Sequence, residues 1–155
     1  MKQSLIGLSR NQIGELLLEY GVSERNLKMR ISQIFHAIYF KGSKKIGDIT
    51  TISKKLREDL DRKYSLERNM IKKELISKDG TKKWLLSLQD KKEIETVYIP
   101  EKKRGSLCVS SQVGCTLNCS FCHTGTMPLV RNLNAYEILS QVLLAKDELG
   151  DWEVD

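Results

Sequence analysis

The spacing of the apolar residues changes after Tyr64, and this change limits the folds that are open to the chain. Before Tyr64, apolar residues recur every three or four positions, which predicts three helices, near residues 9–20, 30–40 and 53–64. Ser9 stands at the N-cap position of the first helix, and Gly21 follows its last apolar residue. The first part of the chain is therefore expected to be a small three-helix unit.

After Tyr64 the pattern becomes extended, and Asp79-Gly80 between two such runs is a strong hairpin signal. The predicted strands form an antiparallel sheet and span residues 70–77, 82–88, 93–99 and 106–110. A last helix is expected at 135–149, with Asn134 as N-cap and Glu137 at the capping-box position. These patterns predict an α+β fold.

Pro100 and the charged turn after it are the expected domain boundary. Residues 1–100 would form the helical domain with its small sheet. Residues 101–155 would form one strand-loop-helix unit, which begins a parallel β/α barrel and needs further units to cover its sheet. We therefore expect the second domain to be truncated.

The positive charge of the chain is concentrated in its first 100 residues, which hold 21 Lys and Arg against 13 Asp and Glu. This excess suits contact with the phosphates of a nucleic acid. A lysine-rich surface without a ligand explains the charge equally well. No apolar run is long enough to span a bilayer, so we expect a cytoplasmic protein without membrane contact.

All four cysteines lie in one segment, and three of them, Cys115, Cys119 and Cys122, spell C-x3-C-x2-C. Three thiolates on a four-iron four-sulfur cluster leave one iron open, and this iron could chelate S-adenosylmethionine (SAM). The rival metal is zinc, with Cys108 or His123 as the fourth ligand. Thiols with a redox role are a third interpretation. The spacing favours the cluster.

Several motifs together resemble one family, the dual-specificity RNA adenine C2-methyltransferases of the radical SAM superfamily, the RlmN type. The motifs are Glu-Thr-Val-Tyr-Ile-Pro at 95–100, Cys-Val-Ser-Ser-Gln-Val-Gly-Cys at 108–115, Cys-Ser-Phe-Cys at 119–122 and Arg-Asn-Leu at 131–133. The resemblance extends over the whole chain, because the family also begins with a small helical accessory domain and a short sheet.

The resemblance implies a role for each matching residue. The three cysteines of the C-x3-C-x2-C motif would hold the cluster, and Phe121 would lie near SAM. Glu95 would accept the proton from C2 of adenine. Cys108 would release the enzyme-RNA adduct by forming a transient disulfide with a second cysteine that this sequence lacks. Without the resemblance, Glu95 is a polar residue on an open strand face and Cys108 is an inert buried thiol.

The resemblance also implies partners and cofactors. They are 23S ribosomal RNA and transfer RNA as substrates, two SAM molecules, and an electron donor such as flavodoxin or ferredoxin. The chain is expected to be a monomer and to be inactive alone, with a separately encoded C-terminal half needed for catalysis. The alternative function is an RNA-binding module or a structural zinc-binding domain without catalysis.

Overall fold

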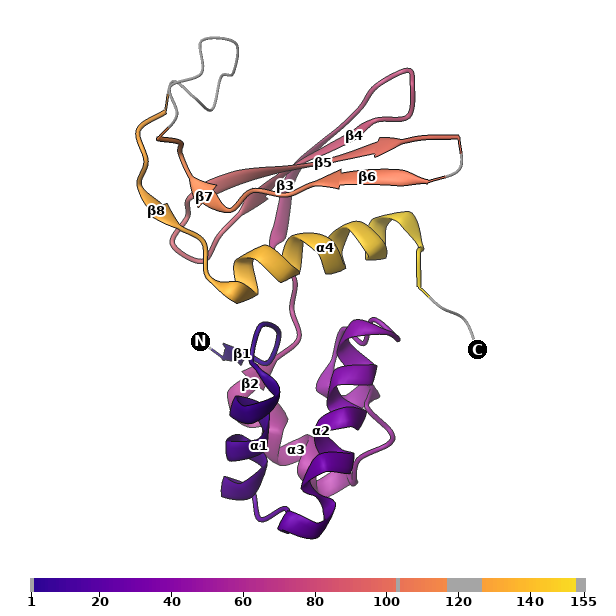
Figure 1. Cartoon of the computed structure of the whole chain (residues 1–155), viewed down its shortest axis with the longest axis vertical. Coiled ribbons are helices and arrows are strands. Elements are labelled where there is room, and N and C mark those ends of the chain that lie inside the picture. The colour runs from indigo at the N-terminus through magenta and orange to yellow at the C-terminus, as the bar shows by residue number, and fades with distance from the viewer. Residues whose placement is uncertain (1, 103, 117–126, 153–155) are drawn as a thin grey trace. The chain divides into compact units, whose positions relative to one another are not determined.

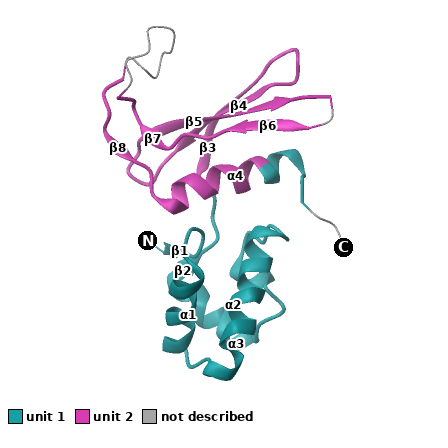
Figure 2. Ribbon diagram, in the orientation of Figure 1, with its two compact units in different colours: residues 1–68, 146–155 teal, residues 69–145 magenta. Residues whose placement is uncertain are grey.

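A computed structural model describes residues 2–102, 104–116 and 127–152 of the chain (Figure 1). The chain divides into two compact units (Figure 2). Unit 1 comprises residues 1–68 and 146–155, and unit 2 comprises residues 69–145. Within the described ranges, no helix is both long enough and apolar enough to cross a membrane.

Unit 1 holds the three predicted helices. They are α1 (Arg10–Glu19), α2 (Glu24–Tyr39) and α3 (Lys54–Lys63), with a short 3-10 helix, η1 (Ile46–Asp48), before α3. Ser9 and Gln12 form the capping box of α1, and the Ser53 side chain accepts a hydrogen bond from the Leu56 amide at the start of α3. Strands β1 (Gln3–Ser4) and β2 (Tyr64–Ser65) pair in parallel.

Helix α2 begins six residues before the predicted start near Arg30. Only its first three residues, Glu24 to Asn26, lie before the apolar spacing, because Leu27 lies four residues before Ile31 and continues that spacing. Ser23 takes the extended conformation of an N-cap residue, and Glu24 in the first turn complements the positive end of the helix dipole. Local capping preferences thus extend the helix beyond its apolar stripe.

Unit 1 also contains a buried ion pair. Nε of Arg68 lies 3.2 Å from Oδ2 of Asp147, and both side chains are almost completely buried. The same guanidinium donates hydrogen bonds to the carbonyl oxygens of Gly42, Ser43 and Leu66. Arg68 therefore gathers three carbonyl groups, from two separate stretches of backbone, around one charge.

Unit 2 is built on a four-stranded antiparallel sheet with the strand order β3-β4-β5-β6. The strands are β3 (Met70–Ile76), β4 (Lys82–Ser87), β5 (Glu93–Pro100) and β6 (Gly105–Cys108). All four predicted strands are present, with ends that differ by one or two residues. The charged turn predicted as a domain boundary joins β5 to β6 as a hairpin. In this turn the Glu101 amide donates a hydrogen bond to the Arg104 carbonyl oxygen at 2.7 Å.

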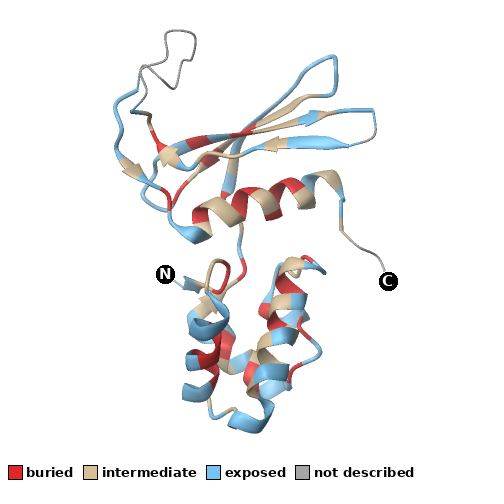
Figure 3. Cartoon of the chain, in the orientation of Figure 1, coloured by how far each residue is buried: buried red, intermediate tan, exposed pale blue. Residues whose placement is uncertain are grey.

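Helix α4 (Ala135–Leu149), most of which lies in unit 2, shares a hydrophobic core with one face of this sheet. Trp84, Leu86 and Ile94 from the sheet pack in this core with Leu144 and Ala145 from the helix. Figure 3 shows the buried positions of both elements in red. Strands β7 (Gln112–Val113) and β8 (Arg131–Asn132) form a separate antiparallel pair.

Candidate functional site

Glu95 and Cys108 lie on the same face of the four-stranded sheet. Cys108 on β6 is paired directly with Val97 on β5, so these two side chains point to one face. Glu95 is two residues from Val97 and points the same way, because strand side chains alternate. Such diagonal neighbours are about 7–8 Å apart in an antiparallel sheet. Both residues are exposed, on the face opposite the core that α4 shares.

The Glu95 carboxylate has one charged partner, which the sequence patterns did not indicate. Its Oε1 lies 2.7 Å from Nζ of Lys83 on the neighbouring strand β4, and both side chains are more than two fifths exposed. An exposed pair of this kind contributes little to stability and opens readily. The carboxylate therefore stays accessible to a ligand. The signal for Lys83 was its place in a predicted strand, but its register with Glu95 cannot be read from one sequence.

The two ends of the cysteine loop are held together at their base. Pairing of β7 with β8 continues through the Cys115 amide, which donates to the Met127 carbonyl at 3.1 Å. Gly114 has φ of +79°, and a Cβ there would lie 2.0 Å from the Pro128 carbonyl oxygen, so only glycine fits. Cys115 is half-buried beside this closed base.

Of the predicted cluster ligands, the structure describes Cys115 alone. Cys119 and Cys122 lie outside the described residues, as do Phe121 and His123. The part of the chain that the structure describes contains no cluster of three acidic, histidine or cysteine side chains close enough to hold a metal. Cys108 is exposed at the end of β6.

Arg131 at the loop base forms a clamp of ion pairs. Its guanidinium binds both carboxylate oxygens of Glu137, at 2.7 and 2.8 Å, and its Nε donates to Asp90 at 3.0 Å. Glu137 and Asn134 form the predicted capping box of α4, with both hydrogen bonds at 2.9 Å. The clamp thus fixes the outgoing end of the cysteine loop to the first turn of the helix.

The clamp changes the titration of both partners. Hydrogen bonds from Arg131 are the main reason that the pKa of Glu137 is lowered, against the opposing effect of burial. The hydrogen bond to Glu137 likewise raises the pKa of Arg131. Since the unfolded Glu137 titrates near pH ~4.3, the stability that this pair contributes is present above that pH and is lost as the pH falls through the lower, folded value.

We therefore expect the free energy of unfolding to fall between about pH 5 and about pH 3, and Arg131→Met to flatten this fall. Urea denaturation at a series of pH values measures the slope. Arg104→Met, which removes an exposed pair with Glu101, is the control and should leave most of the slope in place. Equal slopes for Arg131→Met and the unchanged chain would contradict the assignment.

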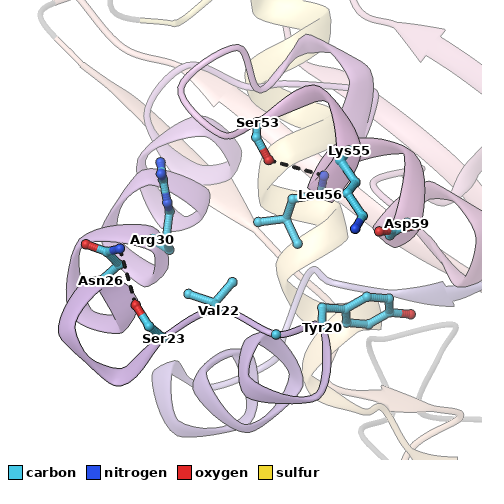
Figure 4. A pocket seen from close by; sticks show the side chains of 10 residues that line it. Tyr20, Val22, Ser23, Asn26, Arg30, Ser53, Lys55, Leu56 and Asp59 are labelled. Atoms are coloured by element: carbon cyan, nitrogen blue, oxygen red, sulfur yellow. Dashed lines mark hydrogen bonds between the residues drawn. The ribbon is translucent and has the colours of Figure 1, made fainter.

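Unit 1 has a pocket of about 340 Å³ between its three helices (Figure 4). The starts of α2 and α3 line it, together with the end of α1 at Tyr20. Two basic residues, Arg30 and Lys55, border it beside Asp59. The Tyr20 hydroxyl is buried and has no hydrogen-bond partner within the described residues. The pocket is polar, with one more positive than negative group at its edge.

Comparison with known proteins finds relatives that match nearly the whole chain. It is 55% identical over 156 residues to a protein of Rhizobium meliloti and 53% identical over 157 residues to one of Bradyrhizobium diazoefficiens, both named dual-specificity RNA methyltransferase RlmN. Each match covers 97% of this chain. The predicted resemblance to the N-terminal part of the RlmN-type methyltransferases is confirmed. No protein-family model matches the chain.

A solved structure has a similar fold. The fold matches that of a radical SAM methyltransferase from Sphaerobacter thermophilus with a TM-score of 0.83 and 36% identity, over 96% of this chain and 43% of that one. The chain spans 38–39% of the length of the two RlmN relatives. The matched region contains Glu95, Cys108 and the three cysteines of the loop.

Proposed function

We propose that the chain supplies the N-terminal part of an RlmN-type radical SAM enzyme that methylates C2 of adenine in 23S ribosomal and transfer RNA. The observation that carries this proposal is the placement of Glu95 and Cys108 on one open face of the sheet, in a chain more than half identical to RlmN relatives. Residues 1–100 would be the accessory domain and residues 101–155 the start of the radical SAM core.

The donor set of the loop suits a four-iron four-sulfur cluster. Cys115, Cys119 and Cys122 offer three thiolates, and the loop base at Cys115 is fixed by backbone pairing and the Arg131 clamp. When bound, the cluster and SAM would supply the radical chemistry that an aromatic carbon without a nucleophilic lone pair requires. Phe121 would lie near SAM.

The residues of the sheet would handle the proton and the thiol. Adenine would lie over the open face, where the Glu95 carboxylate would accept the C2 proton after leaving Lys83. The exposed Cys108 would provide the thiol that releases the product, by forming a disulfide with a second cysteine outside this sequence. Both roles require an accessible side chain, which each residue has.

The RNA would meet positive charge on unit 1. Arg30 and Lys55 border its pocket, and Lys55 lies in the first turn of α3, where backbone amides also favour phosphate oxygens. The electron donor would be a flavodoxin or a ferredoxin, and the enzyme would act as a monomer.

After anaerobic reconstitution with iron and sulfide, the chain should show absorption from thiolate-to-iron charge transfer. Cys115→Ser should lose most of the bound iron, because the cluster would then keep two of its three ligands. Cys108→Ser is the matched control and should bind as much iron as the unchanged chain. If Cys108→Ser lost as much metal as Cys115→Ser, or if the bound metal were zinc, the structural zinc site would be the better interpretation.

Catalysis is tested in a chimera in which this chain replaces the matching N-terminal part of the Rhizobium meliloti relative. The 155 residues alone should give no methylated adenine, because the chain spans 38% of that relative. The chimera restores the remaining length and should methylate C2. Both proteins are incubated anaerobically with SAM, a reductant and ribosomal RNA, and the nucleosides are measured by mass spectrometry.

A further inference from the structure

Gln141 lies inside unit 2 on the buried side of α4, with no exposed surface. An amide in such a place must use its hydrogen-bonding groups within the protein, because no water reaches it. Glu137, Ser140 and Leu144 lie on the same side of the helix. The buried stripe of α4 is therefore partly polar.

All four hydrogen bonds that the Gln141 side chain can make are present. Its Oε1 accepts from the Thr96 hydroxyl and from the Ser110 backbone amide, each at 2.8 Å. Its Nε2 donates to the carbonyl oxygens of Ser110 at 2.9 Å and Glu137 at 3.0 Å. One side chain thus holds both backbone groups of Ser110 and ties them to strand β5.

The residues that Gln141 binds lie next to the two proposed reactive groups. Thr96 follows Glu95 on β5, and Ser110 is two residues beyond Cys108. A further hydrogen bond closes this arrangement, because the Ser110 hydroxyl donates to the Glu95 carbonyl at 2.7 Å. Each reactive residue is therefore joined to Gln141 through its own backbone neighbours.

The hydrogen bonds of the sheet do not extend to Ser110. The β5–β6 ladder ends at the pair of Val97 with Cys108, so Cys108 is the last paired residue of its strand. End pairs of a ladder open more readily than its centre. The Ser110 backbone, just past the end, is bound by the Gln141 amide instead of by another strand.

We propose that Gln141 is a positioning residue that keeps the Cys108 end of β6 closed on β5 and so sets the distance between the Glu95 carboxylate and the Cys108 thiol. The inference rests on the proposed function for its catalytic meaning. Gln141 does not touch the substrate, since it is buried beneath the sheet. It binds Thr96 and Ser110, and their chain neighbours Glu95 and Cys108 lie on the opposite, open face.

The first test is amide hydrogen exchange of the 155-residue chain, followed by NMR. Gln141→Met keeps the length of the side chain and removes its hydrogen bonds, so exchange at the Ser110 amide should rise about tenfold or more. Amides of the central strand β4 should change less than about twofold. An unchanged Ser110 rate would overturn the proposal, and so would an equal acceleration of all amides in unit 2, which would indicate a general loss of stability.

Two further variants sharpen this test. Gln112→Met is the matched control, because it removes a glutamine two residues from Ser110 whose side-chain amide donates to the exposed Asn132 side chain at 2.8 Å. It should leave the Ser110 rate unchanged. Thr96→Val removes one hydrogen bond of the network and keeps those to Ser110. This variant replaces Gln141→Met in the test if Gln141→Met does not fold. It should give a smaller rise in the exchange rate of the Ser110 amide.

The second test uses the chimera. Gln141→Met should lower kcat about tenfold or more while KM for the RNA stays within about threefold, because misplaced reactive groups slow the chemistry without weakening binding. If the unsubstituted chimera methylated no adenine, the proposed function would fail. If it were active and Gln141→Met were equally active, the positioning role alone would fail.

Discussion

Replacing Arg68 with methionine should lower the free energy of unfolding of unit 1 by about 3–5 kcal/mol. The change leaves the Asp147 carboxylate, whose side chain is 5% exposed, without its main counter-charge. It also removes the donors to three backbone carbonyl oxygens in the segments 42–43 and 66. The carboxylate keeps Nζ of the exposed Lys44 at 3.6 Å and Nε1 of Trp152 at 2.9 Å. Loss of the closest counter-charge of a buried carboxylate is still strongly unfavourable, and the unpaired carbonyl groups add to the loss.

Urea denaturation followed by far-ultraviolet circular dichroism measures this loss. Arg62→Met is the control, since Arg62 forms an exposed pair with Asp59 at 3.6 Å and should contribute less than about 0.5 kcal/mol. In the double variant Arg68→Met/Asp147→Leu the buried carboxylate is also removed, so part of the stability should return. If Arg68→Met were as stable as Arg62→Met, the buried pair would contribute nothing to the free energy of unfolding, which would contradict the prediction.

Glu95→Gln and Cys108→Ala should each reduce methylation by the chimera at least about 100-fold. Glutamine keeps the shape of Glu95 but cannot accept the C2 proton, and alanine removes the thiol that releases the product. Lys83→Met is the matched control, because Lys83 contacts the carboxylate and has no proposed chemical role. It should change the rate less than about tenfold.

The two variants should also differ from each other in what accumulates. With Cys108→Ala the RNA should remain bound covalently to the enzyme, because the adduct forms and is not released. Gel electrophoresis under denaturing conditions detects this complex. If either variant methylated RNA at the unsubstituted rate, its proposed role would be wrong.

Local signals predicted most of the secondary structure. The Asp79-Gly80 turn, the N-cap at Ser9 and the capping box of Asn134 and Glu137 act over a few residues, and the structure has all of them. The start of α2 lies six residues before the predicted one, because Leu27 continues the apolar spacing and the N-cap at Ser23 places the polar first turn. The charged turn after Pro100, where the domain boundary is expected, joins β5 to β6; charged residues suit a hairpin turn and a linker alike, so composition does not distinguish the two.

The site was predictable as a set of residues and not as an arrangement. The family resemblance indicated Glu95 and Cys108, but their common face follows from the β5–β6 register, which depends on pairing between strands. Gln141 left a weak signal as a polar residue within the apolar stripe of its helix. Its partners, Thr96 and Ser110, are far from it in sequence, and no local pattern connects the three.

The nucleoside that the chimera produces tests the proposed function most directly. We expect the chimera to convert adenine in ribosomal RNA to 2-methyladenine, detected as the methylated nucleoside by mass spectrometry, and to do so only with SAM and a reductant present. Product in the chimera and none in its Cys115→Ser variant would support the cluster and the family role together. A reconstituted chimera that binds iron and SAM yet leaves adenine unmodified would contradict the proposed function.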